Sequence, residues 1–149
     1  MNRRNLARAV PFLFVSLAVV GAAAVAAGKG AAVVKPRAEL KWTEGGIPGV
    51  SSATVEGDMA KGPSRFYLKY AAGLVTPLHH HSADHYVTTV SGTLVLVVDG
   101  KETRAPQGSY FAFTGGIPHA ARCEGSEDCV MFIDARGPWD VVPEAGAKR

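Results

Sequence analysis

The chain has 149 residues, of which 47% are hydrophobic, 19% are charged and two are cysteines. This length fits a single domain, and the composition excludes a wholly disordered or fibrous protein. The net charge of +3 comes from Arg3, Arg4 and Arg8, because the other 13 of the 16 basic residues are matched by 13 acidic ones. The body of the protein therefore carries no basic excess that would drive binding to nucleic acid.

The first 27 residues have the pattern of a signal peptide. A basic start is followed by the uncharged segment 9–28, and Ala24-Val25-Ala26 and Val25-Ala26-Ala27 both present small side chains where signal peptidase requires them. The alternative is an uncleaved anchor in the inner membrane, because twenty residues at about 1.5 Å each just span about 30 Å of hydrocarbon. Arg3-Arg4 also resembles a twin-arginine signal, so the export route stays open. Either way, we expect a periplasmic or extracellular protein that meets a membrane only through residues 9–28, if these are retained.

Residues 28–49 are predicted to be an extended lead-in, residues 50–143 the folded domain, and residues 144–149 a tail. From Ser51 onward, short runs of β-forming residues alternate with turn pairs such as Ser91-Gly92 and Asp99-Gly100. These runs predict strands at residues 53–56, 65–70, 86–90, 93–98, 101–104, 110–113, 120–123 and 129–134. Many short, evenly spaced strands indicate an all-β protein, either a closed antiparallel barrel or a sandwich.

The two cysteines lie on either side of a short polar stretch. Cys123 and Cys129 enclose Glu124-Gly125-Ser126-Glu127-Asp128, which is typical of a hairpin turn. Such a turn brings two flanking cysteines within disulfide distance, and an oxidising compartment preserves the bond, so we predict a structural disulfide. A thiolate ligand or a redox pair is the alternative, although the chain has no CxxC motif.

Aromatic residues alternate along several of the predicted strands. We predict that they belong to the barrel core rather than to a cofactor site: Tyr67, Tyr70, Tyr110, Phe111, Phe113 and Phe132. Gly137-Pro138-Trp139 is predicted to pack an aromatic ring over one end of the barrel.

All five histidines lie between positions 79 and 119, and His79, His80, His81 and His85 form one cluster. Since side chains in a strand alternate between faces, residues 79, 81 and 85 share one side while residues 80 and 84 share the other. His79 and His81 are then about 7 Å apart, close enough to bind one ion at about 2.0–2.1 Å each. His119 follows a Gly-Gly-Ile-Pro turn that delivers a further nitrogen from a neighbouring strand. Because burying several imidazoles without a metal is costly, we predict a metal site rather than a solvated histidine tract, with His80 outside it.

Two spaced patterns in the chain resemble the motifs of the cupin superfamily. The first consists of Gly73, His79-x-His81, position 85 and Gly92, and the second of Gly108, Thr114, Gly116 and His119. The resemblance covers about residues 50–143, and it implies a small jelly-roll barrel whose metal is held by two His, a Glu and a further His. The chain also resembles exported single-domain cupins of unknown function, in features that include Trp42-Thr43, Ser82-Ala83-Asp84-His85 and Pro118-His119.

Three positions depart from the cupin pattern. Position 85 is His instead of Glu, position 114 is Thr instead of the usual Pro, and position 123 is Cys instead of the usual Asn. The implied metal site is therefore His79, His81, His85 and His119, without the carboxylate of two-His-one-carboxylate iron oxygenases. Such a site suits one divalent transition metal, and Zn, Fe, Ni, Cu and Mn all stay open as its identity.

Three classes of function follow from this interpretation. The first is a barrel pocket that binds, and in an enzyme transforms, a small anionic or oxygen-rich molecule; the resemblance then implies a metal-dependent oxygenase or isomerase. The second is a non-catalytic module that senses metal or ligand, and the third is a barrel that the metal merely stabilises. If all four imidazoles bind, the closed site favours the structural role, whereas an open position permits Lewis-acid chemistry. The resemblance also predicts a homodimer.

Overall fold

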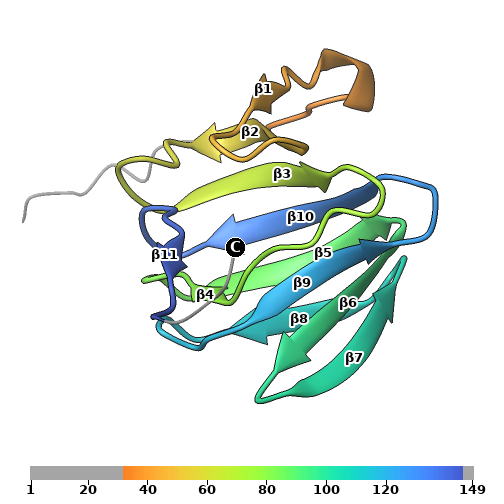
Figure 1. Ribbon diagram of the computed structural model, residues 1–149. Coiled ribbons are helices and arrows are strands. Elements are labelled where there is room, and N and C mark those ends of the chain that lie inside the picture. Colours follow the sequence, from red (N-terminus) through yellow and green to blue (C-terminus); the bar gives the residue numbers. More distant parts are fainter. Residues whose placement is uncertain (1–31, 146–149) are drawn as a thin grey trace, which may run out of the picture. The chain divides into compact units, whose positions relative to one another are not determined.

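The computed structural model describes residues 32–145, so the predicted signal peptide or anchor at residues 1–27 lies outside the described part. From Val34 onward, the described chain forms one compact unit. Its strands form two facing layers, with one short 3-10 helix, η1 (Arg37–Glu39), in the lead-in (Figure 1). Within residues 32–145, no helix combines the length and the hydrophobicity needed to cross a membrane.

One layer is a sheet of six antiparallel strands. Its order is β1 (Thr43–Glu44), β2 (Val50–Gly57), β3 (Ser64–Tyr70), β10 (Cys129–Ala135), β5 (His85–Ser91) and β8 (Tyr110–Phe113). β10 pairs with both β3 and β5, although it lies far from both in the sequence. Such pairing is typical of the crossed connections of a jelly roll. The arrangement confirms the predicted all-β jelly roll.

The other layer contains the three strands β7 (Lys101–Pro106), β6 (Thr93–Val98) and β9 (Ala120–Glu124). The pair β4 (His79–His80) and β11 (Val142–Pro143) lies beside them. Isolated antiparallel bridges join Val75 to Arg122 and His79 to His119. β4 therefore continues this layer and brings the histidine-rich segment next to the start of β9.

Each strand expected from the hydrophobic pattern is present, with ends that differ by at most three residues. The turn between β6 and β7 illustrates why the pattern works. Asp99 and Gly100 have φ angles of 50° and 73°, and a two-residue hairpin of this kind needs positive φ at both positions. β1, β4 and β11 were not predicted, because a two-residue strand exists only through its pairing and has no periodicity of its own.

The hydrophobic core lies between the two layers. β3 turns Phe66, Leu68 and Tyr70 inward, and β10 turns Met131 and Ile133 inward beside them. Leu94 and Leu96 of β6 belong to the same cluster and approach from the opposite layer. Alternation along each strand therefore builds one continuous core.

The prediction that all six strand aromatics belong to this core is wrong for three of them. Tyr67 and Phe132 point to the outer face of the six-stranded sheet, where their rings pack edge to face at 5.2 Å. Tyr110 is 65% exposed. The reason is strand register, because neighbouring residues of one strand face opposite sides and a run of aromatics is divided between them.

A disulfide joins the two layers. It links Cys123 in β9 to Cys129 at the start of β10, and both side chains are buried. The two cysteines flank the hairpin turn as expected from their spacing. Since the bond closes a short loop between strands of different layers, it restricts the unfolded chain and holds the layers together.

Candidate metal centre

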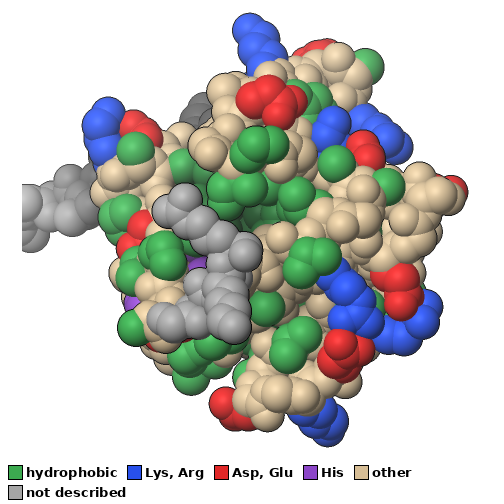
Figure 2. Space-filling view, in the orientation of Figure 1, with side chains coloured by type: hydrophobic (Ala, Val, Ile, Leu, Met, Phe, Trp, Pro, Cys, Tyr) green, Lys and Arg blue, Asp and Glu red, His purple; other side chains and the backbone are tan. Residues whose placement is uncertain are grey.

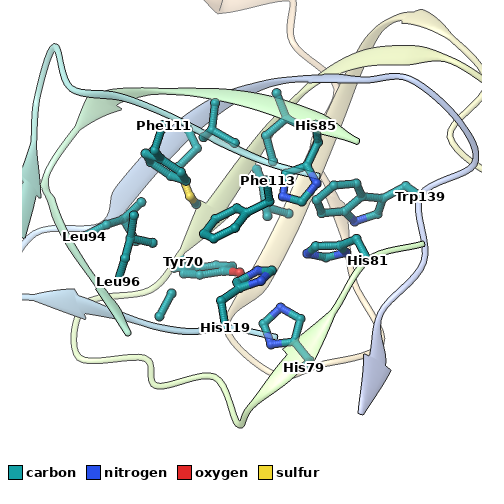
Figure 3. A pocket seen from close by; sticks show the side chains of 15 residues that line it. Tyr70, His79, His81, His85, Leu94, Leu96, Phe111, Phe113, His119 and Trp139 are labelled. Atoms are coloured by element: carbon teal, nitrogen blue, oxygen red, sulfur yellow. The ribbon is translucent and has the colours of Figure 1, made fainter. Parts of the chain in front are cut away.

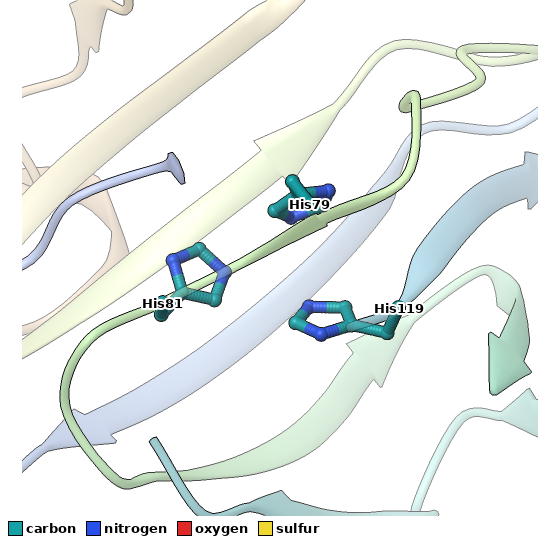
Figure 4. A group of neighbouring side chains, drawn as sticks. All are labelled: His79, His81 and His119. Atoms are coloured by element: carbon teal, nitrogen blue, oxygen red, sulfur yellow. The ribbon is translucent and has the colours of Figure 1, made fainter. Parts of the chain in front are cut away.

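Three of the predicted ligands converge between the layers. One ring nitrogen from each of His79, His81 and His119 lies within 4.8 Å of the other two, and all three side chains are at most 5% exposed (Figure 4). In a tetrahedral site with bonds of about 2.1 Å, ligand nitrogens are about 3.4 Å apart. A small contraction of the group therefore suffices to coordinate one ion.

Backbone carbonyl groups determine which nitrogen of each imidazole is free. His79 Nδ1 lies 2.8 Å from the carbonyl oxygen of Pro77, and His119 Nδ1 lies 2.9 Å from that of Ile117. His81 Nδ1 bonds the carbonyl oxygen of Asp140. Since a carbonyl oxygen only accepts, each Nδ1 carries the hydrogen, which leaves the Nε2 lone pair free to bind a metal.

The local backbone places these rings on one face. His79 and His119 exchange two backbone hydrogen bonds, with N–O distances of 2.9 and 2.8 Å, so they are directly opposed across the strands and project to the same side. A hydrogen bond joins the turn before His119 to the segment that carries His79 and His81, because Gly116 N donates to His81 O at 2.9 Å. Gly115 N donates to the Asp84 carboxylate at 2.8 Å.

Burial lowers the pKa of the four imidazoles that line the cavity. Loss of hydration is the largest cause in each case, and it lowers the pKa of His81 to about 3 and that of His119 to about 4. The pKa values of His79 and His85 are lowered for the same reason. The rings are therefore neutral at pH 7, which is the protonation state that metal coordination requires.

His85 lies beside this group and not within it. Its ring centroid is 4.7 Å from that of His81 and 6.0 Å from that of His119. The side chain is buried and faces the same cavity, and its Nδ1 donates to the carbonyl oxygen of Ala83 at 3.2 Å. The structure therefore brings three of the four predicted ligands together and places the fourth, with its Nε2 free, next to His81.

His80 and Asp84 point away from the cavity, as the alternation of side chains along a strand predicts. His80 Nδ1 lies 2.6 Å from the Glu144 carboxylate on the outer side of β4. Asp84 is exposed and its carboxylate accepts the bond from Gly115, so it faces away from the cavity. Figure 2 shows that hydrophobic side chains gather near the centre of the face of the molecule seen in that view.

The histidines line one end of a cavity whose other walls are mostly apolar (Figure 3). Phe113 stacks on His119 with ring centroids 4.1 Å apart. Tyr70 closes one side, and burial raises the pKa of its phenol to about 12. Imidazoles held among apolar walls suit an ion together with a small ligand.

Sequence reasoning missed what surrounds His81. Trp139 does more than cover the end of the barrel, because its ring stacks on His81 with centroids 3.9 Å apart and it lines the cavity. Asp140 accepts hydrogen bonds from Ser82 N and Oγ at 2.8 and 2.6 Å, while its own backbone carbonyl holds His81. No local signal marks these residues, because their contacts arise when the C-terminal segment folds back onto β4.

Comparisons with known proteins agree with this fold. Residues 66–134 match the family described as the cupin domain (Cupin_2). The DNA damage-repair/toleration protein DRT102 of Arabidopsis thaliana is 31% identical over 81 residues, which are 53% of this chain and 26% of that protein. This chain thus spans about a quarter of that relative's length.

Solved structures share the architecture at low identity. The polyketide cyclase RemF from Streptomyces resistomycificus has a TM-score of 0.64 at 18% identity, covering 77% of this chain and 87% of its own. KdgF from Halomonas sp. has a TM-score of 0.59 at 19% identity, covering 72% and 94%. The match at residues 66–134 assigns this part of the chain to the cupin family, and the solved structures share its jelly-roll fold.

Proposed function

We propose that this cupin domain holds one divalent transition metal ion through His79, His81 and His119, with His85 as a fourth ligand, and binds a small molecule beside it. The observation that carries the proposal is the group of three buried ring nitrogens within 4.8 Å of one another, on imidazoles whose Nδ1 atoms are occupied by carbonyl groups. An ion bound there would supply Lewis-acid polarisation of an oxygen atom of the ligand. Neutral imidazole suits several such ions, so the proposal names no single metal.

Two features support ligand binding over a purely structural ion. The imidazoles line a cavity instead of being enclosed by packed side chains, so an ion held by all four rings can expand its coordination to take a ligand, as reactive sites do. The cavity has a free volume of about 380 Å3 including its mouth. Its enclosed part has room for about two water-sized groups, which suits an ion and one donor atom of a small ligand.

The test is the metal content of untagged, purified protein. We expect about one equivalent of metal in the wild type by elemental analysis, and its loss in both His79→Ala and His119→Ala. His80→Ala is the matched control, because His80 bonds Glu144 on the outer side of the same strand, and it should keep its metal. Full metal content in His79→Ala and His119→Ala would refute the shared site, as would a wild type that cannot be loaded.

We also propose that the protein acts outside the cytoplasm. The N-terminal pattern supports export, and the disulfide between Cys123 and Cys129 is compatible with an oxidising compartment. N-terminal sequencing of the protein from separated cell fractions tests this. A mature chain that starts after Ala26 or Ala27 in the exported fraction is expected, and an intact chain in the cytoplasm would contradict export.

A further inference from the structure

We infer that Tyr70 is a ligand-binding residue of this cavity, whose hydroxyl donates a hydrogen bond to a small oxygen-containing anion held at the His79, His81 and His119 site. The inference rests on the metal binding proposed above. It adds the chemical class of the ligand and a residue that selects it.

The position of Tyr70 follows from strand alternation. It is the last residue of β3, and the periodicity that buries Phe66 and Leu68 also turns its ring inward. The side chain is 8% exposed and lines the cavity together with the histidines. Figure 3 shows its hydroxyl pointing across the cavity toward the histidine rings.

The Tyr70 hydroxyl is free to bond a ligand. It makes no hydrogen bond to another residue in the described range 32–145, and burial raises the pKa of its phenol to about 12. A phenol is protonated at neutral pH and is therefore a donor. A buried donor that faces a cavity without a protein partner gains most from a ligand that accepts its hydrogen bond.

The rest of the lining favours an anion as that ligand. Apart from the imidazoles, only Tyr70 and Trp139 among the described residues around the cavity carry a side-chain O–H or N–H group; the other lining side chains are aliphatic, phenyl or thioether groups. Since the imidazoles are neutral, a divalent ion would bring two positive charges into an apolar enclosure. A small anion offsets this charge, and one of its oxygen lone pairs accepts the hydrogen of Tyr70.

A second cavity adjoins the first. It is lined by Ile47, Val50, Thr76, Pro77 and Val141, and it shares Leu68, Tyr70, His79, His81 and Trp139 with the first. Tyr70 therefore borders both cavities together with two of the three converging histidines.

The test uses cobalt-loaded protein and formate as the anion probe. Wild type, Tyr70→Phe and Tyr67→Phe are loaded with Co2+, and formate binding is followed by the visible absorption of the ion. Tyr67 is the matched control, because it precedes Tyr70 by three residues on the same strand but packs against Phe132 on the outer face. We expect Tyr70→Phe to bind formate about 10- to 100-fold more weakly than the other two, as the loss of a hydrogen bond to a charged group implies.

The cobalt content and the unfolding temperature separate this inference from the proposal on which it rests. All three proteins should hold equal cobalt, and Tyr70→Phe should be no less stable, because its hydroxyl loses no protein partner. Equal formate affinity in wild type and Tyr70→Phe would overturn the role of Tyr70 while the metal site stands. A loaded wild type that does not respond to formate would overturn the ligand class, and a wild type that binds no Co2+ would overturn both proposals.

Discussion

At the scale of single residues, the centre depends on the free nitrogen of each imidazole. Carbonyl groups of Pro77, Ile117 and Asp140 occupy the Nδ1 atoms of the three converging histidines. These acceptors are neutral, whereas metal-bound histidines in many proteins donate to a carboxylate that makes the ring more basic. The protein groups of this centre therefore bring no negative charge, and the consequence can be measured at position 85.

His85 is the residue at which a carboxylate changes the charge balance. Replacing His85 with Glu is expected to raise the affinity for Zn2+ by about tenfold or more, because one negative charge then offsets part of the ion's charge in a buried site. Replacing it with Ala is expected to lower the affinity by about 10- to 100-fold. Competition with a chelating dye at neutral pH measures both effects.

The control for these variants is His80→Ala, which changes a neighbouring imidazole on the opposite face and should leave the affinity unchanged. An affinity of His85→Ala equal to that of the wild type would show that His85 is not a ligand.

Sequence reasoning reached some of these residues and not others. The alternation of side chains along a strand separates His79 and His81 from His80. The structure agrees, since the first two are buried and His80 bonds Glu144 on the outer side. The same reasoning cannot find Trp139 or Asp140, because their contacts with His81 depend on where the C-terminal segment lies after folding. It also cannot single out Tyr70 from Tyr67, since their faces depend on a register that one strand alone does not define.

At the scale of elements, the site depends on a close approach between two segments. A Cβ atom added at Gly115 would lie 2.3 Å from the backbone oxygen of Ser82, so the turn before β9 packs directly against the residues that follow β4. Gly115→Ala is therefore expected to push His119 away from His81. Overpacking of this kind costs about 1–3 kcal/mol of stability, and we expect Zn2+ affinity to fall by tenfold or more.

Urea denaturation and Zn2+ titration of Gly115→Ala measure these losses. Gly62→Ala is the matched control, because a Cβ there meets nothing within 4 Å and the backbone needs no positive φ. Wild-type affinity in Gly115→Ala would contradict the view that this contact positions the metal ligands.

The elements also differ in how far a sequence can predict them. β6 and β7 have hydrophobic runs joined by a turn pair that requires positive φ, so local rules suffice. β4 and β11 pair only through His79 with Pro143 and His80 with Val142, and this pairing exists only once the C-terminal segment has folded back onto β4. The β4 segment, which carries His79 and His80, is thus the part of the site whose structure is hardest to predict from local sequence rules.

At the scale of the whole molecule, the buried imidazoles make stability depend on pH. The rings titrate near pH 6.5 in the unfolded chain, but the pKa of His81 is about 3 and that of His119 about 4 in the folded one. At pH values between the folded-state pKa of each ring and 6.5, the unfolded chain binds more protons than the folded chain, so a lower pH favours unfolding. Metal-free protein should therefore lose stability as the pH falls below 6.5, by about 1.4 kcal/mol per pH unit for each ring that stays neutral.

Urea denaturation of metal-free protein between about pH 7.5 and pH 5 measures this slope. Added Zn2+ should stabilise the protein over this whole range, because only neutral rings bind the ion and His81 and His119 stay neutral in the folded chain down to about pH 4. A stability that stays constant over this range would contradict the lowered pKa values.

The most direct test of the central claim is anomalous diffraction from crystals of the metal-loaded protein. We predict one anomalous peak, about 2.0–2.2 Å from the Nε2 atoms of His79, His81 and His119, with each Nδ1 still bonded to its backbone carbonyl. A peak at another position, or rings that reach the ion through Nδ1, would contradict it.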